Sequence, residues 1–276
     1  MGQTREALRD MEKARQLAPD DPNIPNGLMM MYRGAREYTK SDEVADAAIA
    51  HFPNGPNYYF ARKVSNALDR GDVTVAAERV AAIPVKFNAS GFKSLLHLSV
   101  LFLQRDYREF ARVAGSIQRD DFVEKPIVFM EALIAEKEGD RPRMASLLSA
   151  LATKLEADVQ AGGATKGPRN DPLEIAQLAR THCYLGRMDE ALRESEQAIQ
   201  LSPTAKDAVN GPGNEAIRAE VLMRAGKMEE ALVMLGHLAT IPYGPSYGEL
   251  LNLRWDALRN DSRFQQIVEA ARMAGH

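Results

Sequence analysis

One cysteine and a few histidines are the residues of this sequence with the clearest potential for chemistry. Cys183, the single cysteine of the chain, directly follows His182. A thiol beside an imidazole could pair a nucleophile with its base, but adjacent helical residues point about 100° apart and do not face each other. We therefore interpret Cys183 as a small packed side chain. His97, His182 and His237 lack the i, i+4 spacing of a helical zinc pair, so no metal site is predicted.

Glycine-rich and acidic segments give no better candidate for catalysis. Residues 162–167, GGATKG, lack the G-K-[ST] order of a phosphate-binding loop and are interpreted as a flexible loop. Residues 211–214, GPGN, are interpreted as a helix break with Asn214 as N-cap. Glu131 and Glu136 fit solvated helical faces. Because the kinase motifs H-R-D and D-F-G are also absent, the sequence predicts no enzymatic activity and no cofactor.

The charge and hydropathy of the chain restrict which classes of partner this protein is expected to bind. The chain of 276 residues carries 35 Lys and Arg against 38 Asp and Glu, without a long run of one sign, so neither nucleic acid nor an anionic membrane is expected as a partner. The longest apolar stretch, residues 95–103, is about half of what a membrane-spanning helix needs, so no membrane insertion is expected. The start lacks the apolar core of a secretion signal, and the lone cysteine suits a reducing compartment. We therefore expect a cytoplasmic protein.

A recurring spacing of small residues identifies the elements that must position any functional side chain. Residues 7–19 read A-x3-M-x2-A-x4-P, and residues 41–53 repeat this spacing 34 residues later. A third copy occupies residues 191–203. The first three positions of each copy share one helical face, where small side chains let two helices approach, and the proline follows the helix end. The pattern predicts pairs of helices that pack closely.

Turn residues follow the same period. Gly71, Arg105 and Gly139 lie at successive steps of 34 residues. The next two steps, to Gly186 and then to Gly226, are 47 and 40 residues long. Each of these positions is expected to form the turn within a helical hairpin. The surplus in the longer steps indicates one insertion at residues 160–171 and a smaller one near residues 204–213.

Together these features resemble the tetratricopeptide repeat (TPR) family, which has a 34-residue period and an A-x3-F…P half-signature. The other half, W-x2-L-G-x2-Y, is matched around Leu28 and Tyr32 but has His182 at an aromatic position, and the central repeats also fit a related helical repeat. The resemblance implies an all-α fold, a TPR-like α-solenoid in which antiparallel helix pairs form a right-handed superhelix with a C-terminal capping helix pair.

We expect a single solenoid over residues 1–276. Its parts are N-terminal repeats in 1–53 with the first one truncated, degenerate repeats in 54–159, the inserted loop in 160–171, C-terminal repeats in 172–243 and the cap in 244–276.

The C-terminal segment has a resemblance of its own. Residues 251–268 are similar to the closing segment of TPR regions in bacterial multidomain signalling proteins, including Ser/Thr kinases, nucleotide cyclases and transcriptional regulators. Leu250, Trp255 and Leu258 are spaced to cover the last hairpin, and Asp261 is expected to N-cap a final helix. The resemblance implies that a catalytic domain of the same longer chain is a partner.

The family resemblance also implies a concave groove, lined by the first helix of each pair, that binds a protein or peptide. Projecting the repeat spacing onto the sequence places these residues in the groove: Tyr58, Phe92, Leu95, Phe102, Phe129, Leu133, Arg180, Tyr184, Glu220 and Arg224. Aromatic anchors next to charged residues would suit an amphipathic segment. Some family members clamp a carboxylate with Lys and Asn, but the equivalent positions here include Met30 and Ala176, so that clamp is not predicted.

Our first hypothesis is therefore a non-catalytic protein–protein interaction or regulatory scaffold, part of a larger bacterial signalling protein. Residues 3–18 correspond to the second helix of a hairpin without its first helix. We expect either that the chain is a fragment of a longer protein or that a second copy covers this face. The alternative hypothesis is a structural array that forms homo-oligomers through the uncapped N-terminal face. A remote alternative is an enzyme built on an α-solenoid.

Overall fold

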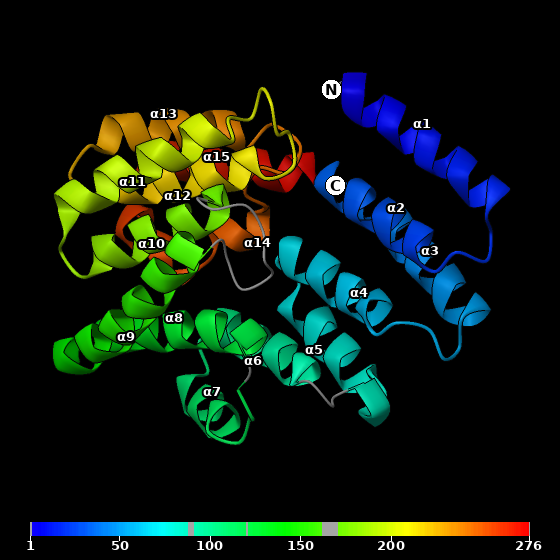
Figure 1. The fold of residues 1–276 in the computed structure, drawn as a ribbon, viewed down its shortest axis with the longest axis horizontal. Helices are drawn as coiled ribbons and strands as arrows, with labels where there is room; N and C mark the ends of the chain where they lie inside the picture. The colour runs from blue at the N-terminus through cyan, green and yellow to red at the C-terminus, as the bar shows by residue number, and fades with distance from the viewer. Residues whose placement is uncertain (1, 88–90, 120, 162–170, 276) are drawn as a thin grey trace.

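The computed structural model describes residues 2–87, 91–119, 121–161 and 171–275, and within these ranges all regular structure is helical. Helices pair in sequence order, and each pair packs on the next (Figure 1). The pairs are α2 (Asn23–Gly34) with α3 (Tyr38–His51), α4 (Tyr58–Asp69) with α5 (Val73–Ala82), α6 (Phe92–Gln104) with α7 (Tyr107–Ala114), α8 (Asp121–Glu138) with α9 (Arg141–Ala161), α10 (Pro172–Tyr184) with α11 (Met188–Leu201), and α12 (Gly211–Arg224) with α13 (Met228–Leu238). The fold is an all-α helical-repeat solenoid, as predicted.

Shorter elements complete the chain at both ends. Helix α1 (Gly2–Leu17) precedes the first pair and packs on α2. A 3₁₀ turn, η1 (Val85–Phe87), follows α5. After α13 come α14 (Tyr247–Leu250), the 3₁₀ helix η2 (Leu253–Leu258) and α15 (Ser262–Ala274).

The turn within each pair has one repeated geometry. The turn residues all have left-handed backbone angles, with φ of 62° at Arg36, 71° at Gly71, 60° at Arg105, 79° at Gly139 and at Gly186, and 78° at Gly226. The next residue donates its N–H to a carbonyl five residues earlier, as in Asp72 N to Ala67 O at 2.9 Å, which is the hydrogen bond of a Schellman motif. The spacing of the turns is confirmed, and Arg36 forms a further turn that was not predicted from the sequence.

Small residues lie where the helices touch. Ser41, Ala45, Ala191 and Ser195 are all fully buried. The Ser41 hydroxyl donates to the carbonyl of Met29 on the facing helix at 3.1 Å, so this polar group costs little inside the core. Close backbone approach then lets larger residues on either side form the continuous apolar core.

The C-terminal elements cap the last pair. Trp255, Leu258 and Phe264 are buried in one cluster with side chains of α12 and α13, including Leu222 and Leu235. Asp261 is the N-cap of α15 and accepts the N–H of Arg263 at 2.8 Å, as predicted. This end of the solenoid therefore has its apolar surface covered.

The C-terminal segment also reaches the first repeats, so the array closes on itself. Tyr243 N–H donates to Gly34 O at 2.9 Å, and the Arg36 guanidinium donates to the carbonyls of Pro245 and Ala271 at 3.1 and 3.2 Å. A Cβ added at Gly248 would lie 1.7 Å from the Leu68 carbonyl oxygen, which shows how closely α14 approaches α4. Both chain ends consequently lie on the same side of the molecule (Figure 1).

Two local expectations are wrong. Helix α12 begins at Gly211, so Asn214 lies inside the helix with 1% exposure and is not its N-cap, a position held by Asn210. Glu131 and Glu136 are ion-paired, with Arg119 and Arg224 respectively, and are not simply solvated. The repeat spacing could not reveal these partners because they lie on other elements. Most of the inserted loop, including the GGATKG segment at 162–167, lies outside the described residues.

Candidate binding surfaces

The structure brings several of the predicted groove residues together on three successive first helices. The Arg180 guanidinium lies 4.0 Å from the Phe129 ring centre, and the Phe129 ring meets the Tyr184 ring edge-on at 5.5 Å. The Tyr184 hydroxyl donates to Glu220 at 2.6 Å, and Arg224 stacks over the Tyr184 ring at 3.5 Å. These contacts join α8, α10 and α12 into one charged and aromatic network.

Burial sets the electrostatics of this network. Burial raises the pKa of Tyr184, and the neighbouring Glu220 carboxylate adds to the shift, so the phenol keeps its proton and donates a hydrogen bond to Glu220. Burial lowers the pKa of Arg180 to about 10, which still leaves the guanidinium charged at neutral pH. Glu220 itself is fully buried, so its carboxylate contacts the side chains of this network in place of solvent.

The remaining predicted groove residues belong to neighbouring clusters. Phe102 and Leu133 are buried in the same apolar cluster as Phe129 and Tyr184, and Leu95 packs against it. Phe92 packs instead against the cluster of α4 and α5. Tyr58 is half-buried on α4 and donates its hydroxyl to the Pro22 carbonyl at 3.1 Å. The ten residues therefore do not form one continuous open surface, and their role in binding stays a prediction.

The chain's own C-terminal segment lies against this network. Leu253 packs on the cluster that holds Phe129, and Arg254 is 3.9 Å from Glu220. Asp256 accepts two hydrogen bonds from Arg105, at 2.7 and 2.8 Å, and one from Lys137 at 3.2 Å. A cavity of about 390 Å³ remains between this segment and helices α8 and α12. Repeat spacing could not indicate this cover because most of it joins distant parts of the chain, as Asp256 lies 151 positions from Arg105 and 119 from Lys137.

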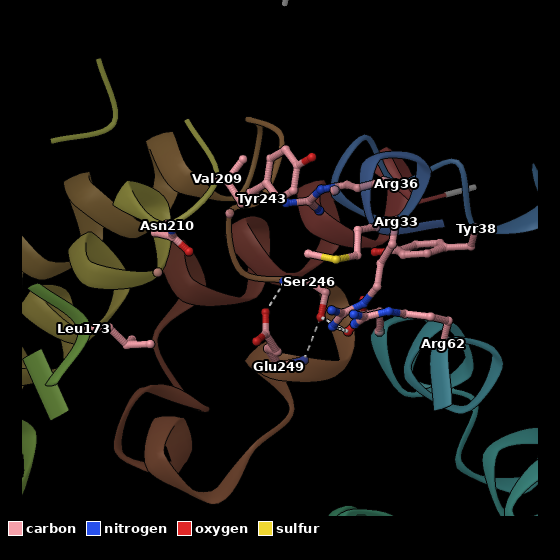
Figure 2. A pocket seen from close by; sticks show the side chains of 15 residues that line it. Arg33, Arg36, Tyr38, Arg62, Leu173, Val209, Asn210, Tyr243, Ser246 and Glu249 are labelled. Carbon is pink, nitrogen blue, oxygen red and sulfur yellow. Dashed lines mark hydrogen bonds and ion pairs between the residues drawn. The ribbon is translucent and has the colours of Figure 1, made fainter. Parts of the chain in front are cut away.

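A second cavity, of about 270 Å³, lies where the two ends of the array meet (Figure 2). Its walls come from α2 and α4 on one side, the first turns of α10 and α12 on the other, and the segment 243–249 behind them. Figure 2 shows Leu173, Val209 and Asn210 facing Arg33 and Arg62 across the opening. We call this cavity the cleft.

Charged residues form the inner part of the cleft. Arg33 holds Asp69 through two hydrogen bonds of 2.6 and 3.0 Å. Burial raises the pKa of Asp69, and the charge of Arg33 opposes that shift. Ser246 donates its hydroxyl to the same carboxylate at 3.3 Å. This pairing joins α2, α4 and the C-terminal segment at one point.

Unlike Arg33, Arg62 has no carboxylate partner among the described residues, and unlike Arg36 it does not use its terminal nitrogens on backbone carbonyls there. Its Nε donates to the amide oxygen of Asn26 at 3.2 Å. Burial lowers the pKa of Arg62, and the positive charge of Arg33 lowers it further. The guanidinium is thus a half-buried, partly desolvated cation at the wall of a cavity.

The entrance of the cleft is apolar. Met30, Leu173 and Val209 line it with exposed fractions of 38%, 48% and 44%, and all three are among the large apolar side chains that the described surface leaves in solvent. Exposed apolar side chains that converge on one opening are typical of binding sites. This site was not predicted from the sequence because its residues come from five separate segments. The left-handed backbone of Arg36 beside the cleft is visible only in the structure, so it gave no local signal in the sequence.

Cys183 and His182, the residues whose types could support catalysis, are both buried in the packed interior. Cys183 is buried, and burial raises the pKa of its thiol to about 12, so the nucleophilic thiolate is not formed near neutrality. His182 contacts Glu194 through Nδ1 at 2.9 Å. Within the described ranges no group of three or more His, Cys, Asp and Glu side chains could hold a metal ion, and no helix there is long and apolar enough to cross a membrane.

Comparisons with known proteins give little further guidance. No protein-family model matches the chain, and no curated protein matches it. Among solved structures, the chain is similar to the TPR2AB domain of yeast Sti1 in complex with an HSP90 peptide, with 14% sequence identity over 99% of this chain and 93% of that chain and a TM-score of 0.33. At this identity and TM-score the likeness carries no argument about family, partner or function.

Proposed function

We propose that this chain is a non-catalytic helical-repeat scaffold that holds a segment of a partner protein. The observation that carries the proposal is the cleft, where exposed apolar side chains surround a charged interior at the junction of both ends of the array. Apolar contacts at such an opening supply binding energy, and the polar groups inside fix the orientation of what binds. A scaffold of stacked hairpins keeps these groups in place without the ligand having to order them.

The predicted groove residues extend this proposal along the inner surface. Arg180 and Arg224 are only partly buried, so they offer the accessible edge of the network on α10 and α12. A partner segment that leaves the cleft would pass along this edge. The proposed place in a larger bacterial signalling protein rests on the resemblance of residues 251–268 to such proteins.

Selection from a library of random peptides displayed on phage tests the proposal, with the immobilised full chain as bait. We expect peptides that bind the wild-type chain and lose binding to a Leu173→Asp, Val209→Asp double variant, because a charge on the rim is unfavourable for apolar contact. The matched control is Val233→Asp, since Val233 is 74% exposed and lies outside the cleft. Peptides that bind the wild type, the control and the cleft variant equally would contradict the cleft as the binding surface.

A second proposal is self-association through the N-terminal face. Leu17, at the end of helix α1, is 77% exposed. An equivalent helix of a second copy would cover this surface. Light scattering at increasing protein concentration tests the idea, and a constant monomeric mass would contradict it.

A further inference from the structure

We infer that the cleft selects a partner segment by an acidic side chain, which enters to meet Arg62 while an apolar neighbour in the same segment packs on Met30, Leu173 and Val209. This inference rests on the proposed function and specifies the chemistry of the partner. It commits to an aspartate or glutamate within an extended peptide segment.

The charges that line the cleft favour an anionic ligand. Three arginines line the cleft, whereas the carboxylates among its lining residues are Asp69 and Glu249. Asp69 is occupied by Arg33 at 2.6 Å, and Glu249 accepts the N–H of Ser246 at 2.9 Å in the capping box of α14. Both acids therefore already have structural partners, and three guanidinium groups against two carboxylates leave the lining with an excess of one positive charge.

Arg62 is the guanidinium that remains available. Arg33 is held by Asp69, and Arg36 donates to the carbonyls of Pro245 and Ala271. Arg62 has the neutral Asn26 as its partner among the described residues, which leaves its two terminal nitrogens as donors toward the cavity. A partly desolvated cation whose terminal nitrogens remain as donors favours a carboxylate, which accepts two hydrogen bonds in parallel from a guanidinium.

The opposite wall favours the same ligand charge. Asn210 and Gly213, at the start of the 14-residue helix α12, line the cleft. The N-terminal end of a helix carries partial positive charge. Asn210 lies on the opposite side of the view from Arg62, with Ser246 and Glu249 between them (Figure 2), so an anion that enters the cleft would have positive potential on both sides.

Size and surroundings favour a side chain of a peptide over a larger group. A volume of about 270 Å³ corresponds to roughly nine water molecules, which admits one acidic side chain and part of its backbone. The apolar side chains at the entrance are suited to the residue next to that acid in the segment. An acidic residue with an apolar neighbour is thus the complementary motif.

The test uses peptides selected on the wild-type chain as described above. We expect the selected sequences to share an acidic residue beside an apolar one. Fluorescence anisotropy with one such labelled peptide should show binding at least about tenfold weaker to Arg62→Gln, and an equal loss when the acid of the peptide is changed to its amide, because each change removes a charged hydrogen bond. Combining both changes should cost little more than either alone.

Two controls keep the outcome clear. Arg108→Gln removes an exposed arginine outside the cleft and should leave the affinity unchanged. The acid-to-amide peptide is measured on the unaltered protein, so its result does not depend on the folding of a variant. Cleft-dependent peptides without an acidic residue, or equal affinity of the wild type and Arg62→Gln, would overturn this inference while leaving the proposed function intact. Failure to select any cleft-dependent peptide would overturn both.

Discussion

Two of the six hairpin turns carry arginine at a left-handed position where the other four carry glycine. A side chain with a Cβ pays roughly 1 kcal/mol to adopt this conformation. In both cases the guanidinium bonds to the C-terminal segment, Arg36 to the carbonyls of Pro245 and Ala271 and Arg105 to the carboxylate of Asp256. The strained turns are therefore the points at which the first repeats hold the end of the chain.

Substitution of Arg105 separates the strain from the contact. Alanine and glycine both remove the hydrogen bonds to Asp256, but only alanine keeps a Cβ at φ near 60°. We expect Arg105→Ala to unfold with a free energy about 1 kcal/mol lower than that of Arg105→Gly. Urea denaturation followed by circular dichroism measures this difference. Equal stabilities of the two variants would show that the turn is not strained.

His182 makes stability depend on pH. The hydrogen bond with Glu194 raises the pKa of this buried imidazole, although burial itself acts in the opposite direction. Because the folded chain binds the proton more tightly than the unfolded chain, the stabilisation is complete below the ordinary histidine pKa near 6.5 and is lost as the pH rises through the higher folded value.

We therefore expect the free energy of unfolding to fall with rising pH through this window in the wild-type chain. The difference between wild type and His182→Gln at each pH isolates the contribution of this residue from that of other groups. Chemical denaturation from pH 5 to 9 provides the measurement. A difference that grows with rising pH would contradict the assigned direction.

At the scale of elements, the close approach of α14 to α4 determines how the C-terminal segment packs against the first repeats. Gly248 meets the Leu68 carbonyl with no room for a Cβ, and Tyr247 and Leu251 pack over the turn at Gly71 in the same way. The segment from Pro245 to Asp256 thus follows the row of turns at Arg36, Gly71 and Arg105. Repeat turns, and not helix faces alone, form its docking surface.

Gly248→Ala tests this contact. The added methyl group would overlap the Leu68 backbone and force α14 away from α4, so we expect a loss of about 1–3 kcal/mol in the free energy of unfolding. Gly213→Ala is the matched control, because its Cβ would meet nothing within 4 Å and alanine favours the helix. Hydrogen exchange should become faster in α4 and α14 for Gly248→Ala only. Unchanged exchange in both helices would contradict the close packing.

At the scale of the whole molecule, closure of the array creates the cleft. Its back wall is the segment 243–249, which is held by Arg36 and by the hydrogen bond from Tyr243 to Gly34. The Asp256 carboxylate adds a further tie. Burial acts to raise its pKa, but the hydrogen bonds from Arg105 and Lys137 outweigh this and lower it to about 2, so the tie persists at any pH above the acid range.

We expect a triple variant, Arg36→Gln, Arg105→Gln and Gly248→Leu, to open the array while the hairpins stay folded. Its radius of gyration from small-angle X-ray scattering should increase, its helical circular dichroism should be retained, and peptides selected on the wild type should no longer bind. An unchanged radius of gyration would show that apolar packing of Trp255 and its neighbours is sufficient to close the array.

The sequence by itself determined the repeated unit of this protein. Small residues such as Ser41 and Ala191 mark the helix contacts, and Gly71, Arg105 and Gly139 mark the turns, because both depend on backbone geometry within a single hairpin. Asp261 as the cap of α15 was readable for the same local reason. Spacing alone therefore predicted an all-α array of helix pairs.

Only the tertiary structure determined how the two ends of the array meet and that a cleft remains between them. The pairing of Arg36 with Ala271 joins residues 235 positions apart, and the cleft combines side chains from both ends of the chain. The course of a solenoid results from small rotations that accumulate from pair to pair, and no residue pattern specifies their sum. For this reason Phe129, Leu133 and Glu220, which were predicted in an open groove, lie buried, and Arg62 lines the cleft without a carboxylate partner among the described residues.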